Sequence, residues 1–321
     1  MGGLGACGDD DDAADDAPGP TNTTAAAGGD STALQIVGNE YSFQAPATVA
    51  GGVVDIEFKN EGKLVHEAFL LDIGDTPQAQ VLTEFKKVIS SEEGVPIPDF
   101  IKPAGGAIET DAGETSKTSV TLSAGNYLIV CTLADSDSEE ESEEGKGEGE
   151  AEGAPAAGDE PAEAEEPAEP AHFEIGMVLP LTVTGGGAGA ALPEGDAQVT
   201  ATDYAFDVQG LEAGDETINF TNASTAQIHH AIVFEFEEGV TPAQGEAAIK
   251  AFGAEGGPPP GTPEPTSDEV GSSVFDAGRG GTFEGEFKAG RTYVFACFIN
   301  DRAGGPPHAF GNNMVKAVAV A

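Results

Sequence analysis

An internal duplication constrains the fold of this chain more than any other feature of its sequence. Two stretches match in the order of their turns and apolar runs. The first contains Tyr41-Ser-Phe43, a Gly-Gly turn and the runs 53–60 and 64–71; the second contains Tyr204-Ala-Phe206, a turn at Gly214 and the runs 217–222 and 228–234. In both, apolar and polar residues alternate over short runs bounded by Gly and Asn, as in half-buried strands. A duplication with shared turns predicts two domains of one architecture.

The match continues downstream through a short helix and further strands. Thr76-Pro77 and Thr241-Pro242 each predict an N-cap followed by a proline at the first helical position. One face of each helix should pack against its domain, with Val81, Phe85 and Val88 in the first and Ala247, Ile249 and Phe252 in the second. Each copy then has a strand that contains Gly and Tyr and ends in Cys, followed later by a Met and a last apolar strand.

Composition favours an all-β fold. The chain of 321 residues has no Trp, 45 Gly and 21 Pro, a mixture that suits short strands joined by turns better than long helices. Several short strands per copy, without sustained alternation of strands and helices, predict an antiparallel sandwich or barrel. We place the first domain at 33–184, a Gly- and Ala-rich linker at 185–196 and the second domain at 197–321.

The residues that can bind soft metals are few, and they follow the duplication. The whole chain has five His, three Cys and three Met. With Met1 and Cys7 set aside, the first copy contains His66, Cys131, His172 and Met177, and the second contains His229, His230, Cys297, His308 and Met314. The order is the same in both copies, with one His left over. This restricted distribution indicates a shared chemical role.

In this arrangement the chain resembles a tandem of cupredoxins, the family of plastocyanin and similar blue-copper proteins. The matching segments are Asn60 to His66, Gly125 to Cys131 and His172 to Met177 in the first copy, and Asn222 to His229, Gly290 to Cys297 and His308 to Met314 in the second. The resemblance implies two Greek-key β-sandwiches, each with a short helical insert. It also implies that His66, Cys131, His172 and Met177 bind one copper ion, and that His229, Cys297, His308 and Met314 bind another. The implied activity is one-electron transfer between redox partners.

The chemistry of such a ligand set suits copper. A thiolate and two imidazoles bind both Cu(I) and Cu(II), and a weak axial thioether raises the potential of the couple. Zinc is the main rival, but a Met with a single thiolate is an unusual set for zinc. Alignment with His66 places His229, and not His230, at the ligand position. His230 then points to the opposite face of its strand, either as a partly exposed polar residue or as a neighbour that tunes the site.

The N-terminal 32 residues predict a membrane tether. Leu4-Gly5-Ala6-Cys7 resembles the lipobox of bacterial lipoproteins, in which the cysteine is lipidated. The residues that follow are mainly Asp, Ala, Gly, Thr and Pro, and such a segment cannot bury enough apolar surface to fold. We therefore expect a lipid-anchored protein outside the cytoplasm, in the periplasm or on the cell surface. The alternative is an isolated Cys in an unstructured arm.

The charge of the chain is strongly negative and unevenly placed. A formal net charge of -44 excludes nucleic-acid binding by phosphate neutralisation. An acidic run at about 134–171 separates Cys131 from His172 by 40 residues, against 10 between Cys297 and His308. A fourfold longer loop adds only about 1.2 kcal/mol of closure entropy, so we expect both sites to bind copper, the second more tightly. The run is either a disordered insertion, a docking segment for a basic redox protein such as a cytochrome or an oxidase, or a means of capturing Cu(II).

The number of histidines separates the candidate functions. Copper oxidases and nitrite reductases are also built from tandem cupredoxins, but their additional copper centres need further His. Once the ligands are assigned only His230 is left, so we expect an electron-transfer protein and not an enzyme. A lipoprotein that stores copper or delivers it by exchange uses the same ligands and stays open as the alternative. A metal-free adhesive sandwich leaves the matched Cys and Met without a role.

Overall fold

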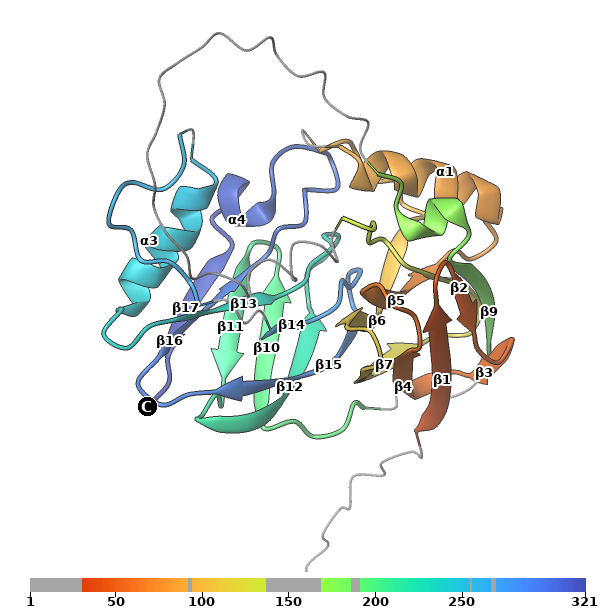
Figure 1. Cartoon of the computed structure of the whole chain (residues 1–321), viewed down its shortest axis with the longest axis horizontal. Helices are drawn as coiled ribbons and strands as arrows, with labels where there is room; N and C mark the ends of the chain where they lie inside the picture. Colours follow the sequence, from red (N-terminus) through yellow and green to blue (C-terminus); the bar gives the residue numbers. More distant parts are fainter. Residues whose placement is uncertain (1–30, 92–93, 137–168, 186–190, 255, 267–269) are drawn as a thin grey trace, which may run out of the picture.

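The computed structural model describes residues 31–91, 94–136, 169–185, 191–254, 256–266 and 270–321 (Figure 1). It is mostly β with a few short helices, as the sequence predicts. The first domain contains β1 (Thr32–Asn39), β2 (Ser42–Gln44), β3 (Thr48–Ala50), β4 (Gly52–Asn60), β5 (His66–Asp72), α1 (Gln78–Ile89), β6 (Lys102–Thr110), β7 (Thr115–Leu122), β8 (Gly125–Val130), the 3-10 helix η1 (His172–Ile175) and β9 (Val178–Thr184). The predicted tether with Cys7 and most of the acidic run lie outside the described residues.

The first domain is a sandwich of two sheets. Strands β2-β1-β4-β7 form one sheet and β3-β9-β8-β5-β6 the other. Alternate residues of β1 and β4, such as Leu34, Ile36 and Phe58, are buried between the sheets, which explains the period-2 pattern of these segments. The outer face of β5 and β8 is covered by α1. Residues 127–130 of β8 are therefore buried on both faces, and they form a continuous apolar run.

The second domain repeats this plan. It contains β10 (Ala197–Thr202), β11 (Ala205–Gln209), β12 (Gly214–Asn222), β13 (Ile232–Phe236), α3 (Pro242–Phe252), β14 (Val270–Gly271), β15 (Gly280–Phe287), β16 (Thr292–Ala296), α4 (His308–Gly311) and β17 (Val315–Ala319). Its sheets are β11-β10-β12-β15 and β14-β13-β16-β17. Helix α3 packs on the outer face of the second of these sheets through Ala248 and Ile249. The helix thus occupies the place that α1 has in the first domain.

The two inserted helices depart from the sequence predictions in detail. Helix α1 begins at Gln78 with Pro77 as N-cap and without a side-chain cap, so Thr76 does not have the predicted role. Thr241, in contrast, caps α3 through a reciprocal capping box with Gln244.

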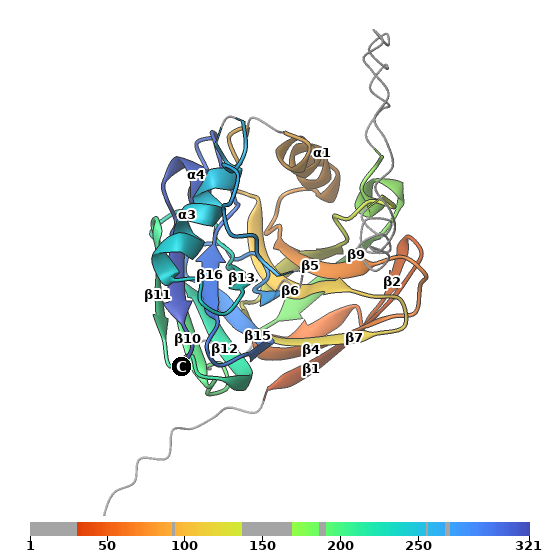
Figure 2. The ribbon, with the colours of Figure 1, turned by 60° about the vertical axis from the view of Figure 1, so that its left-hand side comes forward.

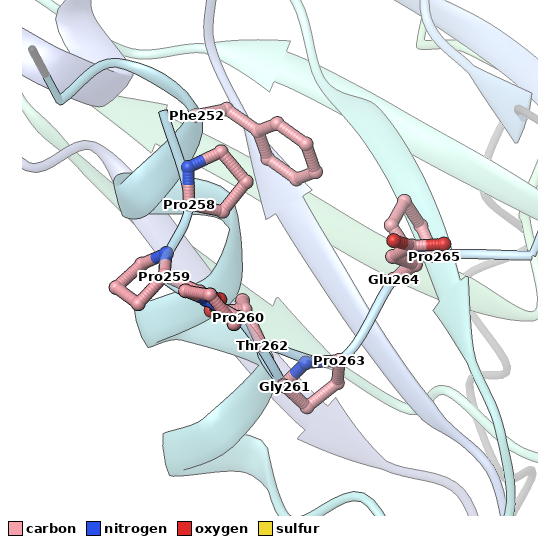
Figure 3. A pocket seen from close by; sticks show the side chains of 9 residues that line it. All are labelled: Phe252, Pro258, Pro259, Pro260, Gly261, Thr262, Pro263, Glu264 and Pro265. Atoms are coloured by element: carbon pink, nitrogen blue, oxygen red, sulfur yellow. The ribbon is translucent and has the colours of Figure 1, made fainter. Parts of the chain in front are cut away.

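The face of α3 that packs also differs from the prediction. Ala247 is exposed, and Phe252 is 46% exposed. Because buried residues recur three and four positions apart from Gly245, it is Ala248 and Ile249 that face the sheet. Phe252 instead lines a shallow pocket of about 380 Å³ with the proline-rich segment 258–265 (Figure 3).

The domains are joined through a shared sheet, which the sequence does not predict. Strand β7 of the first domain pairs with β15 of the second at Val120 and Gly281, so that eight strands form one sheet across both domains (Figure 2). A side chain at position 281 would place its Cβ 2.7 Å from the ring of Phe275 and 2.8 Å from the carbonyl oxygen of Ser119. Glycine is therefore required for this close approach. Phe275 is 1% exposed and belongs to a buried cluster that runs through both domains.

Polar contacts fix the same interface. Arg279 forms an ion pair with Asp72, and its guanidinium lies 5.9 Å from the centroid of the Tyr127 ring. Backbone bonds cross between the domains from Gly105 N to Val274 O at 3.0 Å and from Asp276 N to Pro103 O at 2.8 Å. A buried aromatic, a paired arginine and crossing backbone bonds hold the domains in one orientation.

Candidate metal centres

The first centre gathers residues from three distant segments. His66 is the first residue of β5, Cys131 follows β8, and His172 begins η1. Cys131 Sγ lies 3.8 Å from His66 Nδ1 and 3.4 Å from His172 Nδ1, and the two Nδ1 atoms are 3.1 Å apart. All three residues are 0% exposed. They form a compact, buried group of potential metal ligands.

The second centre has the same construction. His229 precedes β13 and is held by a bridge to Phe275, Cys297 follows β16, and His308 begins α4. Cys297 Sγ lies 3.5 Å from His229 Nδ1 and 3.6 Å from His308 Nδ1. These residues are also 0% exposed. The helices η1 (green) and α4 (purple) place both centres toward the upper side of the molecule in Figure 1.

The same set of backbone hydrogen bonds shapes the loop between the Cys and the Met in both domains. In the first domain the bonds run from His172 N to Leu133 O at 2.7 Å, from Phe173 N to Cys131 O at 2.9 Å, from Met177 N to His172 O at 2.9 Å and from Cys131 N to Met177 O at 3.4 Å. The second domain has the equivalent bonds, from His308 N to Ile299 O, Ala309 N to Cys297 O, Met314 N to His308 O and Cys297 N to Met314 O, at 2.9, 2.7, 3.0 and 3.3 Å. Met177 and Met314 are 0% exposed and are tied to the ligand loop on both sides.

The loop of the first domain keeps the backbone hydrogen bonds seen in the second domain, although 40 residues separate Cys131 from His172. The described chain ends at Ser136 and resumes at Glu169, where the backbone N–H of Ser136 donates to Glu169 Oε2 at 3.0 Å. The two ends of the run therefore lie together, just outside the four backbone bonds of the loop. The expectation that the second site binds copper more tightly remains a prediction.

One asparagine in each domain supports the first His of the centre. Asn60 Nδ2 donates to Leu64 O at 2.7 Å and to Thr110 O at 2.8 Å, and its Oδ1 accepts from Gly62 N at 2.9 Å. Asn222 makes the matching bonds to Gln227 O, Phe275 O and Ser224 N. Both asparagines are 0% exposed. Their satisfied amides fix the turn that leads to the ligand, which explains why an Asn ends the preceding strand in both copies.

Burial sets the protonation of the ligands in the absence of metal. Desolvation lowers the pKa of His66 to about 4 and that of His229 to about 3, and it also lowers the pKa of His308. Desolvation raises the pKa of the Cys297 thiol to about 12. His66 and His229 are therefore neutral and available at pH 7, while the Cys297 thiol must lose a proton to bind a metal.

The buried groups fit copper. Two imidazole nitrogens and one sulfur converge within 4.8 Å of one another in each centre, without a carboxylate among them. Backbone N–H groups of Glu67 and His230 point at the sulfurs of Cys131 and Cys297, and such bonds stabilise a thiolate. One thiolate, two imidazoles and a methionine are the donors of type 1 copper sites.

Four residues to which the sequence assigns no role in metal binding contact the ligand residues or their loop. Glu67 Oε1 accepts from the backbone N–H of Thr132, directly after Cys131, at 2.9 Å. His172 Nε2 lies 3.1 Å from Asp135 Oδ1, and the rings of Tyr41 and Tyr204 contact His172 and His308 edge-on at 5.3 Å. The sequence signal that could have identified them is position: each stands at the same distance from a ligand as its counterpart in the other copy.

His230 has a more specific place than a partly exposed polar residue. It is half-buried, and its Nε2 accepts from the backbone N–H of Phe298 at 2.8 Å. Phe298 follows Cys297 as Thr132 follows Cys131, so His230 is the counterpart of Glu67. Of the two readings given by the sequence, the contact with the site is the one that the geometry favours.

Two β-domains that each bury one cysteine, two histidines and a methionine in this arrangement are cupredoxin-like. The chain contains two His-Cys-His-Met type 1 copper sites, one in each domain.

Comparisons with known proteins give matches among solved structures. The chain is similar to reduced auracyanin from the photosynthetic bacterium Roseiflexus castenholzii, with 18% identity and a TM-score of 0.28, over 47% of this chain and 96% of that one. It is similar to a multicopper oxidase with 13% identity and a TM-score of 0.21, over 90% and 88% of the two chains. It is also similar to the copper nitrite reductase from Nitrosomonas europaea, with 12% identity and a TM-score of 0.20, over 90% of this chain and 93% of that one. No family model and no curated protein matches. At these identities and TM-scores, the assignment rests on the ligand geometry.

Proposed function

We propose that this protein is an electron carrier outside the cytoplasm, with two blue copper sites that each accept and release one electron. The observation that carries the proposal is the complete burial of every His and Cys ligand within a frame of backbone hydrogen bonds. Buried, fixed ligands hold the same geometry in both oxidation states, so little reorganisation accompanies electron transfer. A site that exchanges its metal needs ligands that can be reached from solvent.

The chain's own residues perform three tasks in this function. Bound copper supplies the one-electron couple between Cu(II) and Cu(I). The asparagines and the ligand loops fix the directions of the imidazoles, the backbone N–H groups of Glu67 and His230 stabilise the thiolates, and the apolar surroundings keep water out. At His66 and His229 no proton has to move when the electron does, because burial keeps these two imidazoles neutral across the physiological pH range.

The histidine count supports electron transfer over oxidase chemistry. Four of the five His are placed in the two centres, and the fifth, His230, uses its Nε2 to accept a backbone hydrogen bond. A further copper centre of the oxidase or nitrite reductase kind needs imidazoles that this chain does not have.

The location and partners that we propose follow from the sequence. Lipidation at Cys7 would tether the protein to a membrane, and the acidic chain would attract a basic redox partner. A single lipid chain gives only marginal membrane binding, so stable anchoring needs a second lipid or another contact. No helix in the described ranges has the length and apolar character needed to cross a membrane.

Copper loading followed by absorption spectroscopy and redox titration tests the function. We expect intense thiolate-to-copper absorption that disappears on reduction and returns on oxidation, with copper retained throughout. The Cys131→Ser and Cys297→Ser variants should each lose one part of the absorption, which assigns it to a domain. Loss of copper on reduction would instead identify a storage or delivery protein, and the absence of the absorption from the loaded protein would contradict blue sites altogether.

A further inference from the structure

The two centres share their ligands but differ in the charge of the residues that contact them. Behind the cysteine, the same position is filled by a carboxylate in one domain and by an imidazole in the other. Glu67 accepts from Thr132 N at 2.9 Å and also from the hydroxyl of Thr132, and His230 accepts from Phe298 N at 2.8 Å. Because its Nε2 accepts a hydrogen bond from a backbone N–H, this nitrogen carries no proton and the His230 ring is neutral.

A second difference lies at the other His of each centre. Asp135 and Asp301 both stand four residues after the ligand Cys, and each accepts a hydrogen bond from the tyrosine that covers the ligand His. Asp135 also bonds directly to the ligand, with Oδ1 3.1 Å from His172 Nε2. Asp301 is turned toward Tyr204, Gln227 and the backbone N–H of Ala303 instead.

The equivalent atom of the second centre lacks a partner. His308 Nε2 is buried without a hydrogen-bond partner among the residues that the structure describes. One further pair of carboxylates is matched: Glu40 acts on His66, and Asp203, its counterpart next to Tyr204, acts on His229. Asp135 also acts on His66, whereas Asp301 acts on His308. The contacts of the ligands themselves differ in two ways. Behind the cysteine, the first centre has a carboxylate and the second an imidazole; at the second His, a carboxylate is hydrogen-bonded to the ligand in the first centre only.

An extra negative charge favours the oxidised form of a copper site, because the oxidised site carries one more positive charge than the reduced site. A carboxylate hydrogen-bonded to the far nitrogen of a ligand His also makes that His a stronger donor to the metal. Both effects act on the first centre, and both lower its potential.

We propose that the first centre has the lower reduction potential and the second the higher, so that an electron shared within the chain rests at the second domain. This rests on the proposed function. In the internal transfer one electron leaves the first centre, which is oxidised, and enters the second, which is reduced. No proton and no further reactant takes part. The chain then has a direction, with the donor serving the first domain and the acceptor the second.

Potentials of the two single-site variants test the proposal. Cys297→Ser leaves the first centre and Cys131→Ser leaves the second, and each is titrated at pH 7 while its thiolate-to-copper absorption is followed. We expect the electron to favour the second centre at least tenfold, which is 59 mV for a one-electron couple. Equal potentials or the reverse order overturn the proposal while leaving the proposed function intact. A missing absorption in both variants overturns the proposed function, and this inference with it.

Charge substitutions identify the cause. Glu67→Gln, which can still accept from Thr132 N, and Asp135→Asn should each raise the potential of the first centre, and together they should remove most of the tenfold preference. His230→Glu should lower the potential of the second centre. Glu57→Gln is the matched control, because it removes one negative charge from an exposed carboxylate of β4 that pairs with Lys117. A control shift as large as that of Glu67→Gln would overturn the assignment to these contacts.

Discussion

Copper binding at the second centre should release one proton from Cys297, and this makes the affinity strongly pH-dependent. The thiol is fully buried, and desolvation raises its pKa to about 12. A pH of 7 lies about five units below this pKa, and each unit adds about 1.4 kcal/mol to the free energy of removing the proton. About 7 kcal/mol of the intrinsic copper–thiolate binding energy is therefore used in deprotonation at neutral pH, and this cost falls as the pH rises.

His229 adds nothing to this dependence above pH 5, and burial lowers the pKa of His308 as well. The pKa of His229 is lowered to about 3, so this ligand is already neutral. The logarithm of the apparent copper affinity should therefore rise by about one for each pH unit between pH 6 and pH 9.

Competition against a Cu(I) chelator, carried out on the Cys131→Ser protein, measures this slope at a single centre. Calorimetry in two buffers of different ionisation enthalpy gives an independent count of released protons, which should be one. A flat affinity between pH 6 and pH 9, or a count of zero, would mean that the metal-free thiol is already ionised and that burial does not control its pKa.

Three further predictions concern stability. The metal-free protein should lose stability as the pH falls below about 6.5, because folding lowers the pKa of His229 and protonation of this residue then favours the unfolded chain. In urea unfolding between pH 7 and pH 4, this group should account for a loss of about 1.4 kcal/mol in the free energy of unfolding per pH unit. The His229→Gln variant should show a smaller slope. Asn222→Ala removes three buried hydrogen bonds and should cost about 2–3 kcal/mol. Gln35→Ala, an exposed control on β1, should cost less than about 0.5 kcal/mol in the same assay. Phe275→Ala should lower the free energy of unfolding by about 3–5 kcal/mol. Scanning calorimetry of this variant should show the two domains unfolding less cooperatively. An unchanged single transition would show that the interface around Phe275 does not couple them.

The sequence predicted those parts of the molecule that depend on local pattern or on the duplication. Alternating runs identified strands such as β4 and β12. The shared order of His, Cys, His and Met named the two His and one Cys that the structure brings together in each domain, and the buried Met that follows them. The contacts of Glu67 and His230 could not be predicted in this way, because they depend on which residue of a segment distant in the sequence lies opposite them.

The departures have similar physical causes. Phe252 satisfies the helical spacing but stands at the last residue of α3, beyond the sheet that buries Ile249. The eight-stranded sheet depends on the single pairing of Val120 with Gly281, and a glycine in a strand does not reveal which chain segment approaches it. Composition and periodicity describe one element at a time, whereas these features belong to pairs of elements.

The position between Ser136 and Glu169 gives the first domain a site at which chain can be added without disturbing the metal centre. The bonds from His172 N to Leu133 O and from Ser136 N to Glu169 Oε2 draw the two ends of the added segment together. Natural variation and protein engineering can therefore change its length or charge independently of the copper ligands. A fluorophore or an affinity tag placed there would sit beside a redox centre while the ligand loop kept its shape.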